Sequence, residues 1–106
     1  MSYVLPYIEE FSRHKRVYLH DHDDLSSFVS FKLLNAVSPD LEIQESDRGA
    51  FVVLHLIWGE YEFPFDFDVI HSDKYELVLG GNHLADYDMS SEDLVLPGIV
   101  VPIYQR

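Results

Sequence analysis

One stretch constrains the fold more than any other. It reads YEFPFDFDVI and spans residues 61–70. Apolar or aromatic residues occupy every second position, and the positions between them carry Glu62, Pro64, Asp66 and Asp68. Strict alternation of this kind predicts a β-strand with one face in a core and the other in water. Because Pro64 has no amide proton to donate to a ladder, we expect an edge strand or a bulged strand.

Further strands are expected on both sides of this one. AFVVLHLIWG (50–59) is a nearly continuous apolar run, which is typical of a central strand covered on both faces. Gly59-Glu60 forms a tight turn between the two strands, and His55, inside the apolar run, is interpreted as a hydrogen-bonded core residue. The remaining expected elements are strands at 41–46 and 74–81, a loop or short helix at 82–94, and an extended edge segment at 95–105.

The N-terminal part favours helices. Apolar residues recur at helical spacing over about residues 4–13, with Pro6 tolerated in a first turn. A second helix is expected from an N-cap at Asp23 or Asp24 to about Val37. Helices followed by a run of strands predict an α+β fold, in which two N-terminal helices pack on one face of an antiparallel meander sheet of about four to five strands.

Length and composition limit the class of protein. The 106 residues predict a single domain over 1–106, and 47% hydrophobic residues make intrinsic disorder a poor explanation. The chain has no cysteine, which excludes disulfides, Cys-type zinc sites and thiol catalysis. Its N-terminus lacks the charge order of a signal peptide, and no apolar run has the length of a membrane span. We therefore expect a cytoplasmic protein that does not enter a membrane.

Negative charge dominates the sequence. Nineteen acidic residues against seven Lys and Arg give a net charge of −12, and residues 49–106 contain only two of those basic residues. A field of this sign repels nucleic acid and anionic lipid and attracts basic protein surfaces. Solubility alone is the competing explanation. The basic segment RHKR (13–16) is expected to pair with the acidic half or to hold a single anion.

Three explanations fit the acidic positions of residues 61–70. The charges discourage pairing with another chain, or Asp66 and Asp68 hold a hard cation such as Ca²⁺ or Mg²⁺, or the strand presents a binding face to a basic partner. We favour the binding face because acids mixed with tyrosines continue beyond the strand. Tyr61 shares its parity with Phe63 and Phe65, so a core position is its alternative. The candidate partner-binding residues are Glu60, Tyr61, Glu62, Asp66, Asp68, Asp86, Tyr87 and Asp88.

A metal site is the main alternative. HDHDD (20–24) combines imidazole and carboxylate groups, which suit Zn²⁺ or Fe²⁺. Its spacing matches no diagnostic zinc motif, and capping of a helix by its acids is the simpler interpretation. The residues of this alternative set are His20, His22, Asp24, His71 and His83.

The leading hypothesis is a non-enzymatic binding protein, monomeric or homodimeric, without a cofactor. It occludes a basic surface of a partner such as a nuclease, as an immunity protein to a nuclease-type toxin or a nucleic-acid-mimicking inhibitor does, and it binds no nucleic acid directly. The alternative is a metal-binding module or metal-dependent enzyme. A homo-oligomeric scaffold that pairs through its edge strand is a third possibility.

Overall fold

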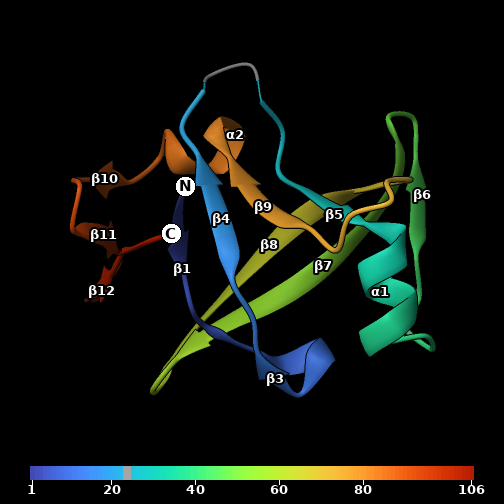
Figure 1. Ribbon diagram of the computed structural model, residues 1–106, viewed down its shortest axis with the longest axis horizontal. Coiled ribbons are helices and arrows are strands. Elements are labelled where there is room, and N and C mark those ends of the chain that lie inside the picture. The colour runs from blue at the N-terminus through green and yellow to red at the C-terminus, as the bar shows by residue number, and fades with distance from the viewer. Residues whose placement is uncertain (23–24) are drawn as a thin grey trace.

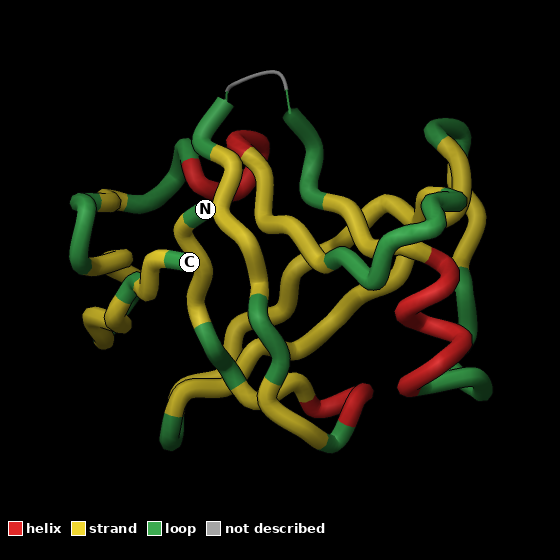
Figure 2. The backbone as a smooth tube through the Cα atoms, in the orientation of Figure 1, coloured by secondary structure: helices red, strands yellow, loops and turns green. Residues whose placement is uncertain are grey.

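The fold is mostly β. The computed structural model describes residues 1–22 and 25–106, with 51% of the chain in strands and 13% helical. Figure 2 shows that helical backbone is confined to short segments. The expected α+β fold, with two N-terminal helices on an antiparallel meander, is therefore wrong. One large curled mixed sheet takes its place, and a small three-stranded sheet lies beside it (Figure 1).

The elements of the described chain fall into three groups. The strands of the large sheet are β1 (Ser2–Val4), β2 (Tyr7–Ile8), β3 (Arg13–His14), β4 (Val17–His20), β5 (Phe28–Ser30), β6 (Gln44–Ser46), β7 (Gly49–Trp58), β8 (Tyr61–Ile70), β9 (Leu77–Gly80) and β13 (Tyr104–Gln105). The strands of the small sheet are β10 (Asp88–Met89), β11 (Asp93–Leu96) and β12 (Ile99–Pro102). The helical elements are a 3₁₀ turn, η1 (Glu9–Phe11), and two helices, α1 (Phe31–Val37) and α2 (Gly81–Leu84).

The order of strands explains why a meander was the wrong expectation. Strands follow one another across the large sheet as β13-β1-β4-β9-β5-β8-β7-β2-β3, and β6 also pairs with β7. β4 pairs with β9 and β5 pairs with β8 in parallel. A parallel pair needs a crossover instead of a tight turn. The sheet therefore joins segments that lie far apart in the sequence.

The N-terminal segment is extended where a helix was expected. Val4, Pro6 and Ile8 are buried, and Leu5 and Tyr7 between them are exposed. This is the period of a strand and not of a helix. The same residues fit both periods over so short a stretch, and tertiary pairing with β4 and β7 decides between them.

The second expected helix is much shorter than its pattern suggested. β5 occupies the middle of the expected range, and α1 begins only after it. The Ser30 hydroxyl caps α1 by accepting a hydrogen bond from the amide of Leu33 at 3.2 Å. The N-cap expected at Asp23 or Asp24 lies outside the described residues.

The β7–β8 hairpin is the longest ladder of the fold. The alternation expected in β8 is confirmed for its centre, because Phe65 and Phe67 are buried and Asp66 between them is exposed. Gly59, with a φ of +60°, supplies the left-handed conformation that the tight turn needs. The inner face of this hairpin joins a core built from both sheets and both helices.

β8 is not the edge strand that Pro64 suggested, because it lies between β5 and β7. Pro64 faces His55 across the hairpin. The amide of His55 points away from β8, toward Glu10, so this pair is one that exchanges no ladder hydrogen bonds. β5 covers the other side of β8 only at residues 68–70. The missing proton of Pro64 therefore removes no hydrogen bond from the sheet.

No helix in the described chain is both long enough and apolar enough to cross a membrane.

Candidate functional site

Carboxylates gather on the outer face of the β7–β8 hairpin. Ladder pairing aligns Asp68 with Phe51, Asp66 with Val53, and Glu62 with Ile57, so these side chains share the face that looks away from the core. His55 lies in the middle of the same face, opposite Pro64. We call this surface the acidic hairpin face. Its members are Glu9, Glu10, His55, Glu62, Asp66 and Asp68.

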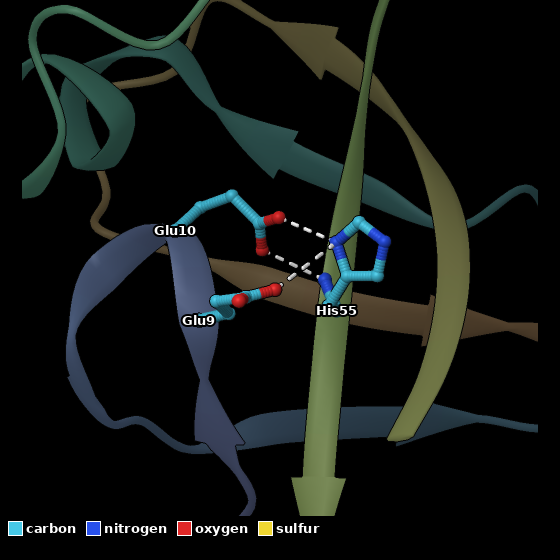
Figure 3. Close-up of side chains that lie close together, drawn as sticks. All are labelled: Glu9, Glu10 and His55. Atoms are coloured by element: carbon cyan, nitrogen blue, oxygen red, sulfur yellow. Dashed lines mark hydrogen bonds and ion pairs between the residues drawn. The ribbon is translucent and has the colours of Figure 1, made fainter.

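Glu10 reaches this face from the turn that follows β2. Its Oε1 accepts a hydrogen bond from the backbone amide of His55 at 2.7 Å, and its Oε2 lies 2.5 Å from His55 Nδ1 (Figure 3). β2 pairs with β7 only as far as Ile8 and Leu56, after which the chain turns away through η1. The carboxylate of Glu10 thus takes the place of the next strand residue. Its side chain is 15% exposed and that of His55 is 34% exposed, so the pair is partly shielded from water.

Three carboxylates affect the pKa of His55. The hydrogen bond to Glu10 raises the pKa of His55, partial burial opposes that rise, and the charges of Glu10, Glu62 and Glu9 add to it. Glu9 Oε2 lies 3.9 Å from the same ring nitrogen. The net result is a pKa above the ordinary value for histidine. Segments distant in sequence therefore concentrate negative potential at one point of the acidic hairpin face.

This ion pair makes the stability of the fold depend on pH. A raised folded-state pKa means that the stabilisation from His55 is fully present below its unfolded value of about 6.5 and is lost as the pH rises through the folded-state pKa. Glu10→Gln removes the charge, so the variant should lose less stability than the wild type over that window. Urea unfolding from pH 5 to 9 measures the difference, with the exposed Glu42→Gln as control. If the free energy of unfolding changed with pH equally in wild type and Glu10→Gln, the pH dependence would not come from the Glu10–His55 pair.

A second network fixes the other end of the acidic hairpin face. His83 Nε2 donates a hydrogen bond to Asp66 Oδ1 at 2.9 Å, and His83 Nδ1 lies 2.6 Å from the hydroxyl of Ser27. That hydroxyl also accepts a hydrogen bond from the amide of Gly80 at 2.8 Å and lies 2.9 Å from Asn82 Oδ1.

The hydrogen-bonded series Ser27, His83 and Asp66 resembles the catalytic triad of a serine hydrolase. Ser27, however, is only 1% exposed. A substrate has no route to so deeply buried a hydroxyl, because a nucleophile must meet the carbon that it attacks. The network is therefore structural. It ties α2 and β9 to the loop before β5, and it anchors Asp66.

The predicted partner-binding residues lie in three places. Glu62, Asp66 and Asp68 belong to the acidic hairpin face. Glu60 and Tyr61 form the hairpin tip, where Tyr61 is 43% exposed and does not enter the core.

The other three predicted residues follow α2. Tyr87 is half-buried, with its ring edge-on to Phe65 at 6.2 Å between centroids, and Asp86 and Asp88 beside it are exposed. The sequence interpretation missed Glu9, Glu10 and His55 as members of the face. Adjacent acids were visible, but no local signal linked them to a histidine 45 residues away.

The alternative metal set does not converge in the described chain. His71 packs on the ring of Phe31 at 5.2 Å, His83 is engaged by Ser27 and Asp66, and Asp24 lies outside the described residues. His20 ends β4, and His22 is exposed beyond it. Within residues 1–22 and 25–106, one group of three metal-type ligands has donor atoms within 4.8 Å of one another, namely Glu9, Glu10 and His55. Their geometry is already explained by the Glu10–His55 ion pair.

No protein-family model matches this chain, and no curated protein sequence matches it.

Proposed function

We propose that this protein is a non-enzymatic binding protein whose acidic hairpin face occludes a basic surface on a protein partner. The convergence of carboxylates on His55 supports this most directly, because Glu9 and Glu10 come from η1 and Glu62 comes from β8. Like charges repel, so collecting them on one face opposes folding unless a partner or a countercharge offsets the repulsion. His55 offsets one of these charges, and the rest stay available.

An apolar groove beside the face supports a protein partner over a small cation. It has a volume of about 540 Å³ and lies at the hairpin tip, lined by Tyr7, Trp58, Tyr61 and Ile99. Glu60 lines the same hollow. Interfaces commonly combine aromatic anchors with charged groups around them. We propose that an apolar side chain of the basic partner enters this groove.

The mechanism is steric and electrostatic. Negative charge steers a basic partner toward the face and speeds encounter at low salt. Carboxylates then occupy positions that phosphates take in a nucleic-acid cleft, so we propose a nuclease or another nucleic-acid-processing enzyme as the class of partner. An immunity protein to a nuclease-type toxin works in this way. The absence of cysteine suits a reducing compartment, and we propose action in the cytoplasm.

Charge reversal at the hairpin tip tests this proposal. Glu60→Lys with Glu62→Lys changes two exposed residues for which the structure gives no side-chain hydrogen bond. Asp66 and Asp68 are left unchanged, because the Asp66 carboxylate accepts a hydrogen bond from His83 and Asp68 is only partly exposed. The reversed variant should slow association with the partner at least about tenfold at low salt and flatten its salt dependence. Affinity capture from lysate identifies the partner, and surface plasmon resonance measures the rates.

Asp40→Lys with Glu42→Lys is the matched control. Both residues are exposed between α1 and β6, so the control carries the same change in net charge away from the face. Retention of the partner by the control and its loss by the tip variant would support the proposal. Equal capture by both variants would show that the acids of the face serve solubility alone.

A further inference from the structure

The basic segment forms no ion pair with any residue that the structure describes. Lys15 and Arg16 follow β3, and Arg106 ends the chain beside β1 through a backbone hydrogen bond to Met1. Across the described residues, no carboxylate lies within 4.0 Å of these three cations; the ion pairs found there involve His55, Lys74 and His83. Internal pairing with the acidic half, one of the two expectations for this segment, is therefore absent from that part of the chain.

Lys15 and Arg16 border a pocket. The pocket has a volume of about 440 Å³ and is lined by Leu5, His14, Lys15, Arg16, Tyr18 and Tyr75. This volume lies within the range of small-molecule sites. Among the described residues, the lining combines cationic groups with two aromatic rings and contains no carboxylate. Such a lining is complementary to an anion that carries a flat or apolar body.

The pocket is preorganised on its basic side. The guanidinium of Arg16 lies 4.7 Å from the ring centroid of Tyr3, and Arg106 donates a hydrogen bond from Nη1 to the hydroxyl of Tyr18 at 3.0 Å. Partial burial raises the pKa of Tyr18, but hydrogen bonds from Arg16 and Arg106 outweigh it, so the net pKa lies below its ordinary value. The potential at this phenol is therefore positive, in contrast to the acidic hairpin face.

Tyr75 supplies an aromatic wall. Tyr75 is among the most exposed of the described large hydrophobic residues, at 54%. It also lines a neighbouring hollow, where Lys32 Nζ lies 5.0 Å from its ring centroid. An exposed tyrosine that lines both hollows offers a surface on which a planar ring can stack.

We propose that this pocket binds a mononucleotide, with the phosphate against Lys15 and Arg16 and the base against Tyr75. Arg and Lys bind phosphate through charge-assisted hydrogen bonds, and aromatic side chains accept any base because every base has a π-face. A polymer of nucleotides fits less well, since a long polyanion meets the repulsion of a chain with a net charge of −12. A single nucleotide stays within the pocket.

Titration of the ¹⁵N-labelled chain with AMP in phosphate-free buffer tests the site, and calorimetry gives the affinity. Adenosine and inorganic phosphate serve as the two part-ligands. AMP should shift the amide signals of Lys15, Arg16, Tyr18 and Tyr75 and should bind at least about tenfold more tightly than either part-ligand. No shift at these residues would overturn the site. Phosphate binding as tightly as AMP would overturn the role of the base, and adenosine binding as tightly would overturn the role of the anion.

Variants separate the pocket from general charge. Arg16→Gln should weaken AMP binding at least about tenfold, because a hydrogen bond to a charged group is lost. Lys15→Gln provides the same test without disturbing the contact of Arg16 with Tyr3. Tyr75→Leu should weaken binding at least about fivefold. Lys74→Gln removes one positive charge next to Tyr75, from a side chain that is 76% exposed and outside the pocket. AMP affinity equally reduced by Lys74→Gln would show nonspecific attraction and overturn the proposal.

Discussion

Gly80→Ala should lower the free energy of unfolding by about 3 kcal/mol. A Cβ at this position would lie 2.4 Å from the carbonyl oxygen of Leu25 and 2.7 Å from the carbonyl carbon of Ser26. Both are backbone atoms, so the loop must move as a whole. Its movement would break the hydrogen bonds that the Ser27 hydroxyl makes to Gly80 and His83. Urea denaturation measures the loss.

Gly59→Ala separates this clash from backbone strain. No atom lies within 4 Å of a Cβ placed at Gly59. Its φ of +60°, however, is a backbone conformation that residues with a side chain rarely adopt. That strain costs about 1–2 kcal/mol. Gly80 has an ordinary extended backbone with a φ of −95°, so its cost comes from the close approach alone. A smaller loss for Gly80→Ala than for Gly59→Ala would mean that the loop before β5 yields easily.

Phe67→Ala should cost about 3–5 kcal/mol, the range for removing a fully buried phenylalanine ring. Phe67 is 0% exposed and belongs to the inner face of β8. Its ring lies 6.5 Å from that of His83, so the cavity would also loosen the support of Asp66. Chemical unfolding and the NMR signals of His83 report the two effects.

Phe31→Ala is the control for Phe67→Ala. Phe31 is 37% exposed and packs on His71 at the surface. Truncating it leaves a smaller cavity, and we expect a loss of about 1 kcal/mol or less. Similar losses for the two variants would show that the core does not centre on β8.

The sequence predicted the β7–β8 hairpin well and the N-terminal half poorly. Both strands have ten residues, and in β8 that length is enough for the alternating pattern to exclude a helix. In β1 and β2 the strands have three and two residues, too short for any period to be decisive. Pairing of these short strands depends on β4 and β7, which local sequence does not reveal.

The same limit applies to the candidate site. Glu62 and Asp66 were recognised because they share the parity of one strand. The sequence does not indicate the contact between Glu10 and His55, because that contact depends on where β2 stops pairing with β7. Pro64 indicates an edge strand because it has no amide proton. The sequence does not show that its nitrogen points away from β7. Register decides that direction, and register is a tertiary property.

The parallel pairing of β4 with β9 also determines how the chain reaches this structure. β4 and β5 are made early, but their partners β9 and β8 are made after the middle of the chain. The β7–β8 hairpin can form locally, but the entropy of closing long loops must be overcome before the sheet is complete. Chains with this pattern of distant pairings fold on a scale of about milliseconds to seconds. β1 can pair with β4 early, but β5 and the second edge of β4 stay unpaired until the later half of the chain supplies β8 and β9.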